Sequence, residues 1–152
     1  MGAQTDDILK MAAITGIGDS TTADAEKAGN AQLNVDVTAL TMNGETITSC
    51  VIDSVQAKVA FDASGAITSD VSAPVATKNE LGANYGMVAW GGAIAEWNEQ
   101  AAAFAAYVTG KTPAEVAGIA ITEATKPAEA DLAASVTISV IGFMNLIAKA
   151  AQ

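Results

Sequence analysis

The sequence predicts an α+β protein in which an antiparallel β-meander packs against C-terminal helices. Residues 33–53 alternate apolar and polar side chains around an Asn-Gly pair, which is typical of a β-hairpin. Two later segments, at about 93–109 and 138–150, place apolar side chains on one helical face. Strands with one apolar face and helices with one apolar stripe bury each other, so we expect the sheet of residues 10–72 to cover these helices.

The chain length sets the domain organisation. With 152 residues, the chain is the size of one domain and can bury a core without disulfide staples. We expect residues 1–9 to form a flexible N-terminal segment and residues 10–152 to form a single α+β domain.

The first half of the chain predicts strands. An apolar stretch at residues 10–17 is followed by a polar loop at 19–30. The next strand alternates apolar with mostly polar positions, and the apolar set is expected to face the core: Leu33, Val35, Val37 and Ala39. Asn43-Gly44 predicts a tight turn, because both central positions of a type I′ turn need positive φ.

A second hairpin is predicted after the first. The return strand at residues 46–53 is followed by a run at 57–61, a turn at 62–65 and a further run at 66–71. Both turns contain Gly and lead into Ile-Thr-Ser, so the two hairpins share one design.

The second half predicts helices. One apolar stripe is formed by Ile94, Trp97, Ala101, Phe104, Ala105 and Val108, and the last by Val140, Ile141, Met144, Ile147, Ala148 and Ala151. Gly110 is expected to end the first of these helices, and Thr112-Pro113-Ala114-Glu115 is a capping box that starts a short one. The last helix should begin near Thr137 or Ser139, either of which can cap it.

Charge and composition exclude several classes of function. The chain carries 17 acidic residues against 7 basic ones, all Lys, for a net charge of −10, and it has no His. An acidic surface without Arg repels polyanions, so we expect no nucleic-acid partner. Without imidazole there is no His-based metal site and no Ser-His or Cys-His pair. No apolar run reaches roughly 18 residues, so no integral membrane span is expected.

The remaining reactive side chains favour structural roles. Cys50 is the only cysteine and lies in a strand-like run, which predicts a buried, unreactive thiol. Glu96, Glu99 and Glu115 are expected to be solvated helix acids. No pattern indicates a catalytic residue, a metal ligand or a nucleotide-binding loop, so the chain is not expected to be an enzyme.

The C-terminal part carries a motif with a family resemblance. Residues Asp131-Leu-Ala-Ala-Ser135-Val-Thr137-Ile-Ser139 precede an apolar helix. This order resembles the FMN-binding domain of bacterial extracytoplasmic electron-transfer proteins, where Asp is followed by Ser-Gly-Ala-Thr-x-Thr/Ser. In that family the final Thr or Ser carries FMN through a phosphoester bond. Thr137 matches the motif, and Ser139 falls on the acceptor position.

The motif departs from the family at three positions. Ala134, Ser135 and Val136 stand where the family has Ser, Gly and Ala. Ser135 adds bulk where a Gly lets the backbone approach the phosphate, so the resemblance implies flavin held without a covalent bond.

A broader resemblance covers the chain from about residue 13 onward. It lies in Thr77-Lys-Asn-Glu-Leu-Gly82, Tyr85-Gly-Met87, Glu96-Trp-Asn-Glu-Gln100, Tyr107-Val-x-Gly-Lys-Thr112 and Ala130-Asp-Leu-x-x-Ser-Val-Thr-Ile-Ser139. These segments are similar to secreted, lipid-anchored proteins of anaerobic bacteria that are distant relatives of the FMN-binding domain. The resemblance implies an extracytoplasmic location, secreted or anchored at the cell surface.

Two classes of function remain open on these grounds. The first is a non-enzymatic domain that binds a flat small ligand such as FMN, with candidate cofactor-binding residues Ser135, Thr137, Ser139, Trp90 and Tyr85. It predicts an open cleft lined by Tyr85, Trp90 or Trp97 beside residues 135–139. The second is a structural or self-assembling cell-surface protein without a ligand, which predicts a homo-oligomer with large contacts between copies.

Overall fold

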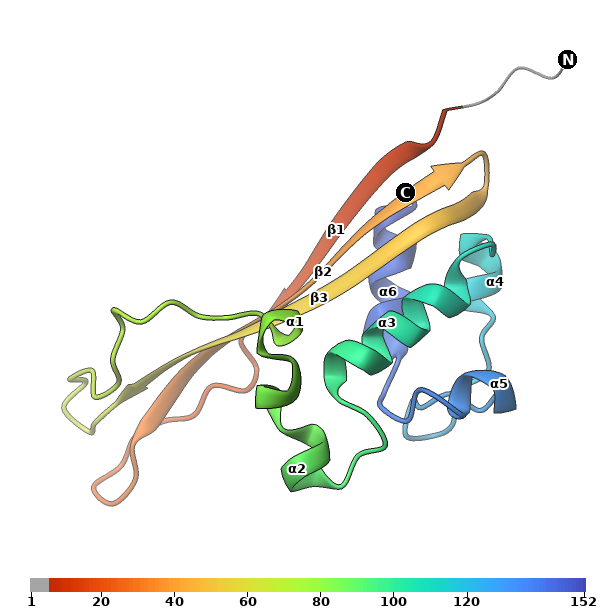
Figure 1. Cartoon of the computed structure of the whole chain (residues 1–152). Helices are drawn as coiled ribbons and strands as arrows, with labels where there is room; N and C mark the ends of the chain where they lie inside the picture. Colours follow the sequence, from red (N-terminus) through yellow and green to blue (C-terminus); the bar gives the residue numbers. More distant parts are fainter. Residues whose placement is uncertain (1–5) are drawn as a thin grey trace, which may run out of the picture.

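The computed structural model describes residues 6–152 and contains one three-stranded antiparallel sheet (Figure 1). The strands are β1 (Ile8–Gly16), β2 (Gly29–Asn43) and β3 (Thr46–Phe61), and they pair in the order β1-β2-β3. The predicted α+β class, with a meander packed against helices, is confirmed. β1 begins two residues before the expected domain boundary, and residues 1–5 of the expected N-terminal segment lie outside the described residues.

The predicted Asn-Gly hairpin joins β2 to β3. Asn43 pairs with Thr46 across the turn, and Gly44 has φ +59°, a conformation that favours glycine. A β-bulge between Thr41 and Met42 shifts the pairing next to the turn.

The predicted second hairpin forms only in part. Residues 46–61 form one uninterrupted strand, and residues 66–71 contribute only an isolated bridge between Phe61 and Ile67. The Asp62 carboxylate accepts the N–H groups of Ser64 and Ala66 and closes the predicted turn. The chain then returns along the end of β3 for a few residues, with Asp62 N–H donating to the Ala66 carbonyl and Thr68 N–H to the Ala60 carbonyl. Both turns therefore reverse the chain, but only the first joins two long strands.

Six α-helices and one 3₁₀ helix follow the sheet. They are α1 (Lys78–Leu81), η1 (Gly82–Tyr85), α2 (Met87–Gly91), α3 (Trp97–Val108), α4 (Pro113–Ala117), α5 (Ala130–Ala133) and α6 (Ile141–Ala150). The predicted capping box of α4 is confirmed, because Thr112 and Glu115 exchange side chain to backbone hydrogen bonds. Among residues 6–152, none of these helices has the length and apolarity to cross a membrane.

The core lies between one face of the sheet and helices α3 and α6 (Figure 1). Its fully buried members include Phe104 and Val108 of α3 and Leu146 and Ile147 of α6. The α3 stripe is confirmed apart from Ile94, which precedes the helix and is exposed.

The stripe predicted for the last helix is partly wrong. α6 buries Phe143 and Leu146, which the stripe omitted, and exposes Ile141 and Ala148. Phe143 contacts the rings of Trp97 and Phe104, so the aromatic contacts with α3 set the rotation of α6.

The face of β2 that packs on the helices is the opposite of the predicted one. Thr38, Leu40 and Met42 are buried under the helices, whereas Leu33 and Val37 remain exposed. Successive side chains of a strand point to opposite faces, so the helices cover the set that includes Thr38, and the regularly apolar set is left open. Alternation in the sequence predicts a strand with two unlike faces, but it does not show which of them the helices cover.

Two leucine substitutions test this assignment with the same chemical change. Leu40 is 1% exposed beneath the helices, and Leu33 is 41% exposed on the other face. In dilute protein, we expect Leu40→Ala to lower the free energy of unfolding by about 3 kcal/mol, because it leaves a core cavity. Leu33→Ala should lower it by less than about 1 kcal/mol. Urea unfolding measures both, and equal losses would contradict the assignment.

Candidate functional site

The aromatic residues expected to line a ligand cleft are separated. Trp97 is buried in the core, with its ring centroid 5.7 Å from that of Phe143 in an edge-on arrangement. Trp90 lies on α2 and is 83% exposed, with its ring over Gly86. Tyr85 lies near Trp97, because the Lys78 ammonium is 5.0 Å from each of their ring centroids.

The segment from Ser135 to Ser139 is held by Gln100, which is fully buried on α3. The Gln100 side-chain oxygen accepts the N–H of Thr137 at 2.8 Å and that of Ile138 at 3.2 Å. Its amide nitrogen donates to the Ala95 carbonyl at 2.9 Å. The Ser135 hydroxyl turns back to the Leu132 carbonyl. These contacts hold the segment, which joins α5 to α6, against the first turns of α3.

The expected cap of the last helix is wrong. Val140 occupies the N-cap position of α6, and neither Thr137 nor Ser139 caps the helix. The Ser139 hydroxyl instead lies 2.5 Å from the Thr125 hydroxyl, and Val140 N–H donates to the Thr125 carbonyl. The loop that contains Thr125 therefore packs against the segment before α6. Its Thr125 residue engages both the Ser139 hydroxyl and the Val140 N–H.

The expectation of a solvated Glu96 is also wrong. Glu96 is only 7% exposed, and its carboxylate accepts the N–H groups of Met87 and Val88 at 2.9 and 3.1 Å. It therefore ties the first turn of α2 to the start of α3, and this satisfies a buried charge with backbone donors. Among residues 6–152, His, Cys, Asp and Glu form no group of three or more that could hold a metal ion.

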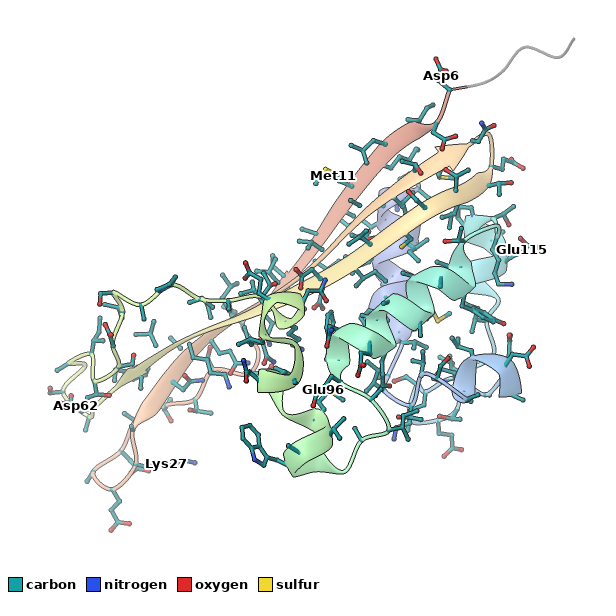
Figure 2. The ribbon with its side chains drawn as sticks, viewed as in Figure 1. Asp6, Met11, Lys27, Asp62, Glu96 and Glu115 are labelled. Atoms are coloured by element: carbon teal, nitrogen blue, oxygen red, sulfur yellow. The ribbon has the colours of Figure 1, made fainter. Side chains whose placement is uncertain are left out.

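Two surfaces outside the core have the form of binding sites. The first is the sheet face that the helices leave uncovered, here called the open face. Its apolar members are Leu9, Met11 and Ala13 of β1, Leu33, Val35, Val37 and Ala39 of β2, and Val51, Val55, Ala57 and Val59 of β3. Met11 projects from β1 away from the helices (Figure 2) and is 70% exposed.

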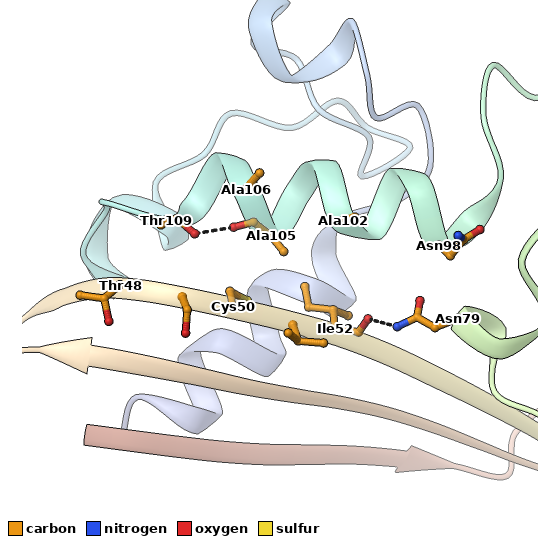
Figure 3. Close-up of a pocket in the computed structure, with 11 residues that line it drawn as sticks. Thr48, Cys50, Ile52, Asn79, Asn98, Ala102, Ala105, Ala106 and Thr109 are labelled. Atoms are coloured by element: carbon orange, nitrogen blue, oxygen red, sulfur yellow. Dashed lines mark hydrogen bonds between the residues drawn. The ribbon is translucent and has the colours of Figure 1, made fainter. Parts of the chain in front are cut away.

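The second surface is a groove of about 360 Å³ between β3 and α3 (Figure 3). One wall is the outer edge of β3 at Thr48–Ile52. The other wall is formed by α3 and the residue that follows it, through Asn98, Ala102, Ala105, Ala106 and Thr109, with Asn79 of α1 at one end. We call it the β3–α3 groove. Its volume lies within the range of about 300–1,000 Å³ that is usual for ligand sites.

Cys50 lines the β3–α3 groove and is half-buried. Burial raises the pKa of the Cys50 thiol above its usual value, and the Thr38 hydroxyl, 3.7 Å from the sulfur, opposes this in part. The thiol is therefore mostly protonated at neutral pH, but it is half-buried and not fully buried as predicted.

Sequence reasoning missed Gln100, Asn98 and Glu96 as positioned side chains. A signal for Gln100 existed, because it lies on the same helical stripe as Trp97 and Phe104, where a polar residue needs buried partners. Comparisons of the chain with models of protein families, with curated proteins and with solved structures give no match.

The role of Gln100 predicts a large loss of stability on its removal. Gln100→Ala would leave the N–H groups of Thr137 and Ile138 without their acceptor inside the protein, so we expect unfolding to become easier by about 3 kcal/mol. Asn145→Ala, on the exposed side of α6, is the matched control and should change stability by less than about 0.5 kcal/mol. Thermal and urea unfolding of both variants measure the difference, and a neutral Gln100→Ala would contradict the assigned role.

Proposed function

We propose that this chain is a non-enzymatic, self-assembling domain whose copies associate through the open face. The proposal rests on the position of the helices. They cover the face of the sheet whose apolar pattern is less regular, and they leave the regularly apolar face exposed. Monomeric soluble proteins rarely expose a large continuous apolar patch, and a patch of this kind is typical of an interface.

The open face is mostly apolar along the sheet, and its polar members are Thr15, Thr41, Ser49 and Asp53. Where β2 and β3 extend past the helices (Figure 1), the side that faces the helices becomes polar. There an amide ladder runs from Asn30 through Gln32 and Asn34 to Asp19, with hydrogen bonds of 3.3, 2.8 and 2.5 Å. The opposite side of the same stretch presents Leu33 and its apolar neighbours. The extension is therefore amphipathic, and its apolar side continues the open face.

Very little charge interrupts the open face. Among the described residues of the three strands, Asp53 is the one ionisable side chain that belongs to it. Asp53 is half-buried, and its carboxylate accepts the N–H of Asn79 at 3.1 Å, so it is occupied by α1 at the edge of the sheet. A second apolar surface would therefore meet a single carboxylate on this face, and that carboxylate accepts the N–H groups of Ser54 and Asn79.

The area of the face suits a second copy of the chain. Strands of 9, 15 and 16 residues give a footprint of roughly 600 Å², from a rise of about 3.4 Å per residue and a strand spacing of about 4.8 Å. A standard interface buries about 800 Å² on each partner. Two such faces related by a twofold axis would pack about 10 Å apart as a β-sandwich.

We also propose an extracytoplasmic location, on the basis of the family resemblance. A cell-surface assembly domain needs no cofactor, and its acidic residues would keep the outer surface of the assembly soluble. Fractionation of the native host with an antibody to the chain tests the location independently of the assembly.

Oligomeric state tests the proposal. We expect wild-type protein to form dimers in a sedimentation concentration series, and added salt to strengthen them, because each copy carries a net charge of −10. Met11→Lys should weaken the association at least about tenfold, because the ammonium would be desolvated in the interface. It should leave the thermal unfolding of dilute protein unchanged, since Met11 is 70% exposed.

Val88→Lys is the matched control for this experiment. Val88 is also an exposed apolar residue, at 46%, but it lies on α2 and outside the open face. Association should survive Val88→Lys. A wild-type protein that stays monomeric throughout the series, or an equal loss with both variants, would contradict the proposal.

A further inference from the structure

We propose that the β3–α3 groove binds a short extended peptide, which adds as a fourth strand to the outer edge of β3. The site lies at the outer edge of β3 and shares Val51 with the open face, but the inference does not depend on self-assembly. Three features carry it: an unpaired strand edge, a facing helix wall built from small side chains, and a buried acceptor without a partner.

The outer edge of β3 is already paired at both ends of the groove. At one end, Ile47 N–H donates to the Lys111 carbonyl at 2.9 Å, and Gly110 N–H donates to the Ile47 carbonyl at 2.7 Å. At the other end, the Asn79 side chain donates to the Ile52 carbonyl at 2.9 Å (Figure 3). At both ends, the partner groups bond to β3 as the backbone of a neighbouring strand would. The edge is therefore formed to accept a strand, and the stretch between these ends lacks one.

Cys50 supplies the free backbone groups in that stretch. Peptide groups of an antiparallel strand point alternately to its two neighbours, so Cys50, two residues before Ile52, directs its N–H and C=O away from β2 as Ile52 does. Among the described residues, neither group has a backbone partner outside the sheet. A peptide residue opposite Cys50 would supply both partners.

The helix wall leaves room for the side chains of an added strand. Ala102 and Ala106 are exposed along the groove, although α3 is packed tightly on its other side. Asn98 stands at the end of this wall, and its Oδ1 atom is buried without a hydrogen-bond partner. A buried unsatisfied acceptor is costly, and a donor brought by a ligand would satisfy it.

These features define the chemistry of the peptide. The span from Ile47 to Ile52 is five residue steps, or roughly 17 Å, so about four extended residues fit between the paired ends. The side chains that face Ala102 and Ala106 must be small and apolar, such as Ala, Val or Thr. Lys residues outside this core would favour association with a protein of net charge −10. This is recognition by strand addition, in which backbone bonds supply affinity and side-chain pockets supply specificity.

The test uses the synthetic peptide acetyl-Lys-Lys-Val-Ala-Val-Ala-Lys-Lys-amide and the single thiol of the chain. Cys50 lines the groove, so a bound peptide should slow its alkylation by iodoacetamide at least about tenfold at saturation. The backbone amide resonance of Cys50 should shift along the same titration. A peptide of the same sequence with N-methyl groups on all four core residues has no core N–H to donate to the edge from either side and should give no protection.

Variants locate the binding on α3. Ala102→Phe fills the groove from an exposed helix position and should weaken peptide binding at least about tenfold, whereas Ala148→Phe, at an exposed position of α6, should leave it unchanged. Met11→Lys should bind the peptide like wild type, which separates this test from self-assembly.

Three results would overturn the assignment. The first is the absence of protection by the unmodified peptide, and the second is protection that persists with the N-methylated peptide or with Ala102→Phe. The third is protection of Cys50 that rises with protein concentration alone, because it would place a strand of a second copy at this edge.

Discussion

The burial of one face of a three-stranded sheet under α3 and α6 is the contact on which the rest of the structure depends. A small isolated sheet is marginal in water, and it becomes stable when a helix layer covers it. Leu40, Ile47 and Ile52 provide the strand side of this contact, and Phe104 and Phe143 fill the space above them. The other elements maintain it: Gln100 fixes the entry to α6, and Glu96 holds α2 against α3. Residues 6–152 form one such layer of helices, so the second face of the sheet and the outer edge of β3 are left uncovered.

The two uncovered surfaces differ in what they can bind. The open face is broad, nearly free of charge and without backbone groups to pair, so it offers apolar area that a second flat surface can match. The β3–α3 groove is narrow and offers directional hydrogen-bond groups with little area. The first suits association between large surfaces, and the second suits a single extended segment. Neither uses the residues that the family resemblance indicated, because Ser135, Thr137 and Ser139 are engaged by Leu132, Gln100 and Thr125.

The fold class could be predicted because it depends on local patterns. The Asn43-Gly44 turn, the capping box at Thr112 and the α3 stripe are each set by residues close in sequence, and each is confirmed. The covered face of β2 could not be predicted in this way, since alternation gives two faces and does not say which one the helices reach. The second predicted hairpin is only a short return of the chain, because its pairing with β3 ends soon after the bridge between Phe61 and Ile67. Thr137 and Ser139 do not cap α6, and the Ser139 hydroxyl is hydrogen-bonded to Thr125, which is distant in sequence. Local sequence patterns therefore predict the helices and strands, while long-range contacts determine which of their faces and side chains pack together.

We propose that the open face is an interface and not a solvated surface. Met11 reports on it directly, because its terminal methyl group lies on the open face, away from the groove and from every helix (Figure 2). The most direct measurement is the relaxation of that methyl resonance by a soluble gadolinium chelate, followed from dilute to concentrated protein. The account predicts strong relaxation in dilute protein and protection as copies associate, with no such change at an exposed helix residue such as Val88. A Met11 methyl group that remains equally accessible at every concentration would contradict it.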